Sequence, residues 1–287
     1  MAALGLTVAS VLTGATVADS STRPTIVSGV TEWGALATQL VGADAKVVSL
    51  LTDPNADPHE HQATISDAGY VARASIVIEN GAGYDTWLTQ LVRASNSAVT
   101  VVNVGRLMGV SAGHNPHLFY NPIAAIKFVK ALTAVLAHRG GFADLAARSR
   151  ALLTRLDATQ AAVAAIARGC SQVKVAATED VASYLLTDAK LRVVTPEALR
   201  LAVGNGVDPS VQDLATALAQ LRARPAFLID NVQTATPLTG ELVSAAKATH
   251  VPIIRVTETM RGSDYVGLLD RTVSSMRADL RRQGCLP

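Results

Sequence analysis

Short runs of β-branched residues alternate with stretches rich in alanine and leucine twice along this chain of 287 residues. In the first half the predicted strands are 25–28, 46–51, 75–79 and 99–104, and the predicted helices are 32–41, 66–74 and 85–93. In the second half the predicted strands are 173–177, 192–195, 226–229 and 253–256, and the predicted helices are 180–186, 210–221, 238–248 and 264–282. This alternation is typical of a mainly parallel sheet covered by helices. It predicts an α/β fold with two doubly wound lobes.

The stretch between the two halves, residues 122–168, is dense in alanine and leucine and is broken only at Gly140 and Gly141. It predicts two consecutive helices, 123–138 and 142–168. A helix of the second length spans roughly 40 Å at a rise of 1.5 Å per residue. We therefore expect a rigid helix that joins two lobes. The predicted organisation is a leader at 1–23, an N-terminal lobe at 24–138, a linking helix at 139–169 and a C-terminal lobe at 170–287.

Composition excludes several classes of protein. Apolar residues make up 49% of the chain, which is enough to bury a large core and excludes a disordered protein. The net charge is +2, and the absence of any basic block argues against nucleic-acid binding. Cys170 and Cys285 lie too far apart in the sequence for a CxxC redox centre or a cysteine zinc knuckle. Whether they form a disulfide is left open, because sequence spacing does not reveal a Cα distance.

Residues 1–18 carry no charge and end with Thr16 and Ala18, small residues at the −3 and −1 positions of a signal cleavage site. This pattern predicts an export signal, and the alternative is a buried N-terminal helix. We expect a mature monomeric chain that begins near Asp19, in the periplasm or cell envelope. The absence of a cysteine near that point gives a lipid anchor no attachment residue.

Metal-capable side chains follow four of the predicted strands, where ligands of doubly wound sheets bind. These residues are His59 and His61, His114 and His117, Glu179, and Glu258. Two of the four segments belong to each half, so they could meet in a cleft between lobes. The alternative is that the histidines lie on the surface and the glutamates cap the helices that follow them. Spacing alone leaves both possibilities open.

The order of these segments resembles the zinc- and manganese-binding proteins of bacterial ABC importers. The matching segments are Asp57-Pro58-His59-Glu60-His61, residues 77–88, Asn115-Pro116-His117 with residues 118–122, residues 178–185, and residues 251–258. The likeness covers roughly residues 24–285. It differs from the family pattern at Ala63 and Ile65, which replace prolines, and at Asn121, which replaces an aspartate.

The resemblance implies two α/β lobes bridged by a rigid helix, with one divalent metal ion held between them. Carried over by position, the ligands are His59 and His117 from the first lobe and Glu179 and Glu258 from the second. Many relatives carry aspartate at the last position, so Asp230 is the alternative to Glu258. The metal is expected to be cargo that is delivered to the membrane permease of an ABC importer.

Two neutral imidazoles and two carboxylates cancel the charge of a divalent ion. Zn²⁺ and Mn²⁺ are the expected ions, ahead of Fe²⁺, which accepts the same donors. The histidine-rich loop of many zinc scavengers is absent between Gly105 and His117, which favours manganese without excluding zinc.

Two alternatives give the metal another role. A metal-dependent hydrolase would need an open coordination position and a nearby base, for which His61 or His114 is available. A metal-stabilised surface adhesin would hold its ion as a structural element. The chain has no GxSxG, HExxH, P-loop or GxGxxG segment, so no motif favours an enzyme.

Overall fold

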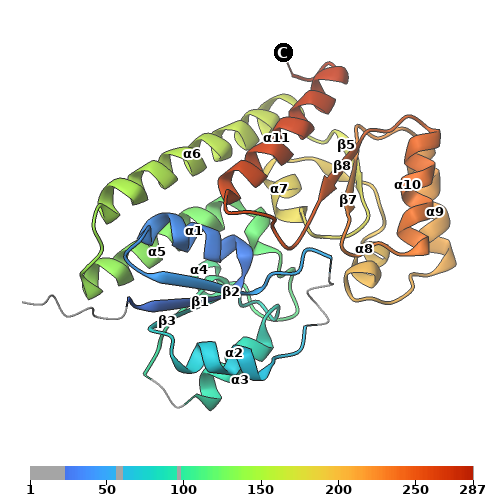
Figure 1. Cartoon of the computed structure of the whole chain (residues 1–287). Helices are drawn as coiled ribbons and strands as arrows, with labels where there is room; N and C mark the ends of the chain where they lie inside the picture. The colour runs from blue at the N-terminus through green and yellow to red at the C-terminus, as the bar shows by residue number, and fades with distance from the viewer. Residues whose placement is uncertain (1–22, 56–60, 96–97, 287) are drawn as a thin grey trace, which may run out of the picture.

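The computed structural model describes residues 23–55, 61–95 and 98–286. The predicted export signal and His59 lie outside these residues. The described chain forms two sheets of four parallel strands each, with helices around them (Figure 1). The predicted α/β fold with two lobes is thereby confirmed.

The N-terminal sheet has the strand order β2-β1-β3-β4. Its strands are β1 (Thr25–Val30), β2 (Lys46–Leu51), β3 (Ile76–Glu79) and β4 (Thr100–Asn103), and its helices are α1 (Thr31–Val41), α2 (Ile65–Ala72), α3 (Thr86–Ala94), α4 (Val104–Met108) and α5 (Pro122–Arg139). Alternate side chains of β1 enter different cores: Ile26 packs with Trp33 and Phe128, and Val27 packs with Leu88 on the opposite face. Helices therefore cover both faces of this sheet.

The C-terminal sheet repeats the same pattern in the order β6-β5-β7-β8. Its strands are β5 (Lys174–Ala177), β6 (Arg192–Val193), β7 (Leu228–Asn231) and β8 (Ile253–Val256), and its helices are α7 (Ser183–Asp188), α8 (Glu197–Gly204), α9 (Val211–Arg222), α10 (Pro237–Ala248) and α11 (Tyr265–Arg282). In both sheets the third strand of the chain joins on the opposite side of the first from the second. Ligand sites of such sheets form at the carboxyl ends of the strands, near this change of direction.

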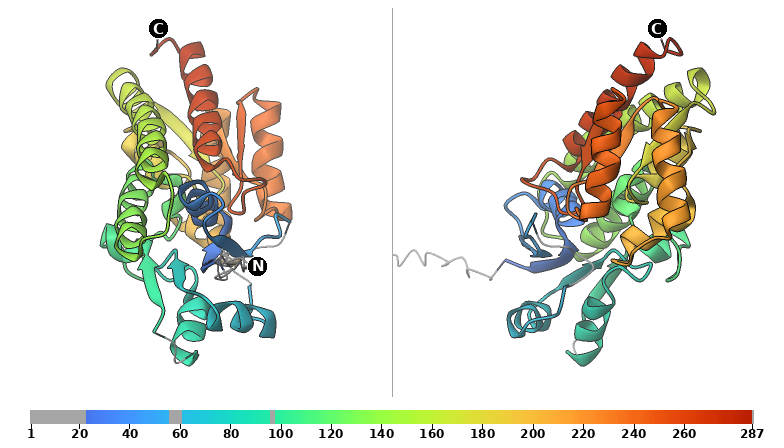
Figure 2. Two further views of the ribbon diagram at one scale, coloured as in Figure 1. Left: turned by 60° about the vertical axis from the view of Figure 1, so that its left-hand side comes forward. Right: turned by 90° about the vertical axis from the view of Figure 1, so that its right-hand side faces the viewer.

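The two long helices after the first sheet match their prediction closely. α5 begins where the side chain of Asn121 accepts hydrogen bonds from the backbone N–H groups of Ile123 and Ala124. α6 (Leu145–Gly169) has 25 residues, and its buried positions recur every three or four residues, from Leu145 to Ile166. It packs against α5 and α11 and passes both lobes (Figures 1 and 2). Residues of both lobes accordingly belong to one continuous hydrophobic core.

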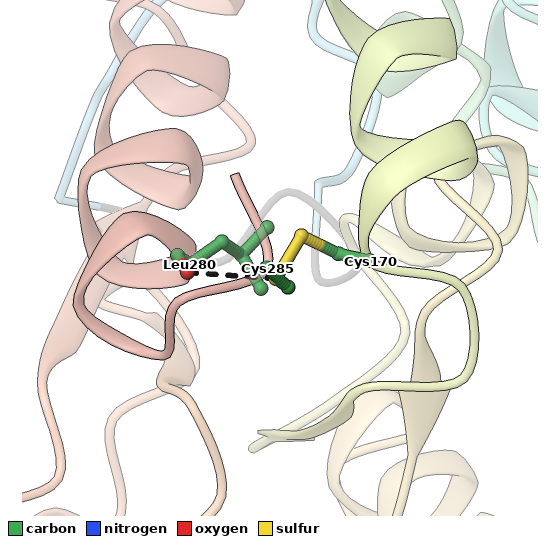
Figure 3. The surroundings of a disulfide bond; sticks show 3 residues. All are labelled: Cys170, Leu280 and Cys285. Carbon is green, nitrogen blue, oxygen red and sulfur yellow. Dashed lines mark hydrogen bonds between the residues drawn. A yellow bond between two sulfur atoms is a disulfide. The ribbon is translucent and has the colours of Figure 1, made fainter. Parts of the chain in front are cut away.

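Cys170 and Cys285, whose pairing the sequence leaves open, form a disulfide with a Cα–Cα distance of 5.2 Å. Cys170 follows α6, and Cys285 follows α11 near the carbonyl oxygen of Leu280 (Figure 3). The bond therefore joins the end of the long linking helix to the C-terminal segment. Within the described parts of the chain, no helix has the length and apolar character needed to cross a membrane.

Candidate metal centre

Three of the four predicted ligands come together between the lobes. His117, Glu179 and Glu258 are buried, and one ligand atom from each lies within 4.8 Å of the others. His117 lies in the loop that leads to α5, Glu179 follows β5, and Glu258 follows β8. Among the residues that the structure describes, this is the group with the composition and geometry to hold a metal ion.

The imidazole of His117 is oriented by Asn115. The Oδ1 atom of Asn115 lies 2.8 Å from Nδ1 of His117 and accepts a hydrogen bond from the His117 backbone N–H at 2.9 Å. Its Nδ2 atom donates to the carbonyl oxygen of Asp180 at 2.7 Å, which fixes the orientation of the amide. Because Oδ1 can only accept, Nδ1 carries the proton in this contact, and Nε2 of the neutral ring keeps a lone pair for a metal ion.

Nε2 of His117 faces Oε2 of Glu258 at 3.1 Å, across the boundary between the lobes. The two atoms that face each other are a nitrogen and a carboxylate oxygen, both of which can act as metal ligands.

The two carboxylates are linked by an asparagine that the sequence analysis did not identify. Nδ2 of Asn231, the last residue of β7, donates to Oε1 of Glu179 at 2.5 Å and to Oε1 of Glu258 at 2.7 Å. The neighbouring Asp230 is outside the cluster. Successive side chains of a strand point to opposite faces, so Asn231 and Asp230 cannot both face the site. In the sequence, the signal that could have identified Asn231 is its place as a polar residue just after the predicted strand 226–229.

The loop after β8 holds Glu258 through its backbone. Oε1 of Gln233 accepts hydrogen bonds from the N–H groups of Glu258 at 2.6 Å and Thr259 at 2.7 Å. From the N-terminal lobe, the hydroxyl of Tyr120 donates to the carbonyl oxygen of Thr257 at 3.0 Å. Neither Glu179 nor Glu258 is a helix cap: Ala182 is the N-cap position of α7, and the side chain of Asp264 caps α11. The capping alternative is therefore wrong for both glutamates.

The surroundings of the cluster are acidic and buried. Glu32, in the first turn of α1, is fully buried, and burial raises the pKa of its carboxyl to about 8. Burial, together with the charge of Glu258, also raises the pKa of Tyr84, whose hydroxyl donates to Oε2 of Glu258 at 3.0 Å. Buried carboxylates that share a small volume favour a cation among them, because charge in a low-dielectric interior must be compensated.

The other two predicted histidines make contacts elsewhere. Nε2 of His61 lies 3.5 Å from Oδ2 of Asp67, and its ring packs against Trp87 at a centroid distance of 4.4 Å. His114 is exposed and lies near Ser111. Asn55, shortly before the segment that carries His59, accepts a hydrogen bond from Arg261 at 3.0 Å. That contact places Asn55 beside the loop that follows Glu258.

The fold has several counterparts among solved structures. FpvC, a solute-binding protein of Pseudomonas aeruginosa in complex with Ni²⁺, superposes with a TM-score of 0.72 at 20% identity, over 91% of this chain and 98% of that one. The periplasmic zinc-binding protein TroA of Treponema pallidum superposes with a TM-score of 0.72 at 19% identity, over 90% of this chain and 99% of that one. A Mn-bound mutant of a periplasmic metal-binding protein of Candidatus Liberibacter asiaticus superposes with a TM-score of 0.71 at 14% identity, over 90% of this chain and 100% of that one. At these identities the likeness establishes the fold.

The family follows from the sequence itself. A family model described as zinc-uptake complex component A, periplasmic, matches residues 26–278. The match runs from β1 into α11 and includes each of the loops that carry His117, Glu179 and Glu258. The chain therefore belongs to the periplasmic zinc-uptake component A family.

Proposed function

We propose that this protein captures one divalent transition metal ion, Zn²⁺ or Mn²⁺ ahead of Fe²⁺, between its lobes and delivers it to the membrane permease of an ABC importer. The observation that carries this proposal is the buried cluster of His117, Glu179 and Glu258, to which both lobes contribute. One imidazole nitrogen and carboxylate oxygens suit each of these ions. The structural counterparts described as bound to Ni²⁺, Mn²⁺ and Cd²⁺ support a site for a transition metal.

We assign His59 as the fourth ligand. The contact between Asn55 and Arg261 supports this assignment, because it holds the start of that segment beside the loop of Glu258. With His59, the site would have two imidazoles and two carboxylates, whose negative charges match a divalent ion.

The ion would be cargo that ties the lobes together. A ligand that contacts both lobes stabilises the arrangement in which its donors meet, and a permease can distinguish that arrangement from the empty one. Membership of a solute-binding family supports this role over catalysis. The contacts of His61 with Asp67 and Trp87, and the exposure of His114, support it further, because these are the residues that could have served as a base.

The remaining features of the proposal follow the same family. The chain would be an exported monomer, with a leader at 1–23, an N-terminal lobe at 24–138, a linking helix at 139–169 and a C-terminal lobe at 170–287. The periplasmic description of the family and the disulfide between Cys170 and Cys285 support export, because disulfides persist in oxidising compartments.

The test is a titration of chelator-stripped protein with Zn²⁺ and Mn²⁺ under buffered free-metal conditions. The variants are His59→Ala, His117→Ala, Glu179→Ala and Glu258→Ala. Matched controls are His138→Ala and Glu241→Ala, which remove an exposed histidine and an exposed glutamate. We expect one reversible site, weakened in every ligand variant by at least the roughly 10- to 100-fold that losing a ligand's outer partner costs. The controls should bind as the unaltered chain does.

Two results would contradict the proposal at different levels. Unchanged affinity in the ligand variants would overturn the ligand assignment. A chain that binds neither metal would overturn metal capture itself. Delivery is tested separately, by asking whether metal-loaded protein stimulates ATP hydrolysis by the reconstituted permease more than metal-free protein does.

A further inference from the structure

On the basis of the metal capture proposed above, we propose that two side chains outside the metal cluster position the imidazole of His117 from opposite lobes. These side chains are Asn80 of the N-terminal lobe and Tyr184 of the C-terminal lobe. They hold residues 115–117, which we call the histidine loop, on its two sides. The geometry of His117 as a ligand then depends on contact between the lobes.

Asn80 holds the histidine loop from the N-terminal lobe. It follows β3 and is fully buried. Its Oδ1 atom accepts a hydrogen bond from Nε1 of Trp33, in α1, at 3.0 Å, which sets the orientation of the amide. One hydrogen on Nδ2 is then directed to the carbonyl oxygen of Pro116 at 2.8 Å, and the other to that of Gly81 at 3.1 Å. Because Pro116 directly precedes His117, Asn80 fixes the backbone from which the imidazole extends.

The backbone of Asn80 is held as well as its side chain. The carboxylate of Asp85 accepts hydrogen bonds from the N–H groups of Asn80 at 2.6 Å and Gly81 at 2.8 Å. The carbonyl oxygen of Asn80 accepts from the N–H of Gly105 at 2.8 Å. A buried polar network in which every member is bonded is rigid. Asn80 therefore ties the histidine loop firmly to the N-terminal sheet.

Tyr184, in α7, holds the same loop from the C-terminal lobe. Its hydroxyl donates to the carbonyl oxygen of Asn115 at 2.7 Å. The side chain of Asn115 in turn donates to the carbonyl oxygen of Asp180 at 2.7 Å. The carboxylate of Asp180 forms an ion pair with Arg200, in α8, so this acceptor is itself anchored in the C-terminal lobe. Two hydrogen bonds thus join the histidine loop to that lobe.

The two attachments meet at the ring of His117. The adjacent carbonyl groups of Asn115 and Pro116 accept hydrogen bonds from different lobes. The Oδ1 atom of Asn115 also accepts from the backbone N–H of His117 and faces Nδ1 of its ring. If the lobes separate, Asn115 loses its partners in the C-terminal lobe, and the ring is held from one side only. Contact between the lobes therefore helps to direct Nε2 of His117 toward Glu258.

The experiment measures affinity for Zn²⁺ and Mn²⁺, by competition with a metal indicator, in Asn80→Ala, in Tyr184→Phe and in the double variant. The matched control for the second is Tyr70→Phe, which removes a hydroxyl from α2. The control for the first is Leu88→Ala, which removes a buried side chain of the same lobe that packs with Val27, and so lowers stability.

A second readout needs no metal. Nuclear magnetic resonance of the imidazole nitrogens in the chelator-stripped chain reports the tautomer and surroundings of His117. The signals of this ring are identified by their loss in His117→Ala. A residue that only stabilises the fold would leave these signals unchanged, whereas a residue that positions the histidine loop would not.

We expect Tyr184→Phe to weaken both metals by roughly two- to tenfold, the effect of one neutral hydrogen bond. Asn80→Ala should weaken both by roughly tenfold or more, the scale on which the outer partners of ligands act. The second substitution should cost less in the double variant than it does alone, because a loop released on one side gains less from its remaining anchor. The ring signals of His117 should change in both single variants, and the two controls should leave affinity and signals unaltered.

Unchanged affinity and unchanged ring signals in Tyr184→Phe would overturn the inference, and so would losses that are independent in the double variant. An equal loss of affinity in Leu88→Ala would assign the effect of Asn80 to stability and would overturn it too. If Asn80→Ala does not fold, Tyr184→Phe, which keeps the aromatic ring, still decides. Failure of the unaltered chain to bind either metal would overturn the proposed function, whereas binding that depends on His117 but not on Asn80 or Tyr184 would overturn this inference alone.

Discussion

The hydroxyl oxygen of Tyr84 lies 3.0 Å from Oε2 of Glu258, so a side chain of the N-terminal lobe donates a hydrogen bond to a carboxylate of the C-terminal lobe. Burial and the nearby charge of Glu258 raise the pKa of Tyr84, which keeps the phenol protonated and able to donate. Tyr84 therefore helps to position the carboxylate of Glu258 at the contact between the lobes.

We expect Tyr84→Phe to weaken metal binding by roughly tenfold, because the outer partner of a ligand carboxylate is removed while the ring is kept. Competition with a metal indicator measures the change. Tyr70→Phe, which removes a hydroxyl from α2, is the matched control and should bind as the unaltered chain does. Equal affinities for Tyr84→Phe and Tyr70→Phe would show that the Tyr84 hydroxyl does not position Glu258.

Gln233→Ala should destabilise the folded chain, because Oε1 of Gln233 accepts from the backbone N–H groups of both Glu258 and Thr259. A buried donor without an acceptor costs about 1–3 kcal/mol, so the free energy of unfolding should fall by about 2 kcal/mol. Urea denaturation of the metal-free chain measures this loss. Gln212→Ala, at an exposed position on α9, should lose far less. A loss no greater than that of Gln212→Ala would contradict the role of Gln233.

Glu32 should make the metal-free chain less stable as the pH rises. Burial raises its pKa from 4.5 to about 8, so between these values the folded chain keeps a proton that the unfolded chain has released. The stabilisation is complete below the unfolded pKa and is lost as the pH rises through the folded pKa. We therefore expect the free energy of unfolding to fall between about pH 5 and about pH 8.

Glu32→Gln isolates this contribution, because a neutral amide does not titrate. The fall in stability with pH should be smaller in the variant, measured by urea denaturation of chelator-stripped protein. Burial also raises the pKa of Asp85, to about 7, and this effect has the same sign and is present in both proteins. If the free energy of unfolding falls equally with pH in the two proteins, Glu32 is not responsible for the fall.

Replacing Cys170 and Cys285 with serine should lower the free energy of unfolding by about 2–5 kcal/mol, because the disulfide closes a long loop of the unfolded chain. Denaturation with and without a reductant measures the effect: the reductant should destabilise the unaltered chain and leave the double variant unchanged. Metal affinity should stay the same in the double variant, because neither cysteine belongs to the cluster of His117, Glu179 and Glu258. Weaker metal binding would show that the disulfide also orders the site.

The regular elements of this fold could be predicted because their signals are local. β-branched runs indicated the strands, and the dense alanine and leucine content of residues 122–168 indicated α5 and α6. The short helices α4 and α8 were not predicted, since segments of 5 and 8 residues carry few periodic positions. The order of strands within each sheet is also not visible in such a pattern, because it depends on contacts between distant segments.

The residues of the site also divide into those that local sequence signals could predict and those that depend on packing between distant segments. His117, Glu179 and Glu258 were identified because metal-capable side chains follow strands in motifs with a known order. Asp230 was named as the alternative to Glu258, and Asn231 was not considered, because which of two adjacent residues at a strand end faces the site depends on contacts with the neighbouring strands. Glu32 was missed because a glutamate is seldom fully buried, and its burial depends on packing from both lobes.

The distance in sequence between the partners of the metal cluster has a consequence for when the protein acquires its ion. His117 and Glu258 are separated by 141 residues, and α6 and all four strands of the C-terminal sheet lie between them in the chain. An extended or partly synthesised chain holds these side chains apart and offers no pocket for an ion. Loading must therefore follow folding, and the compartment in which the chain folds determines which pool of metal it first samples.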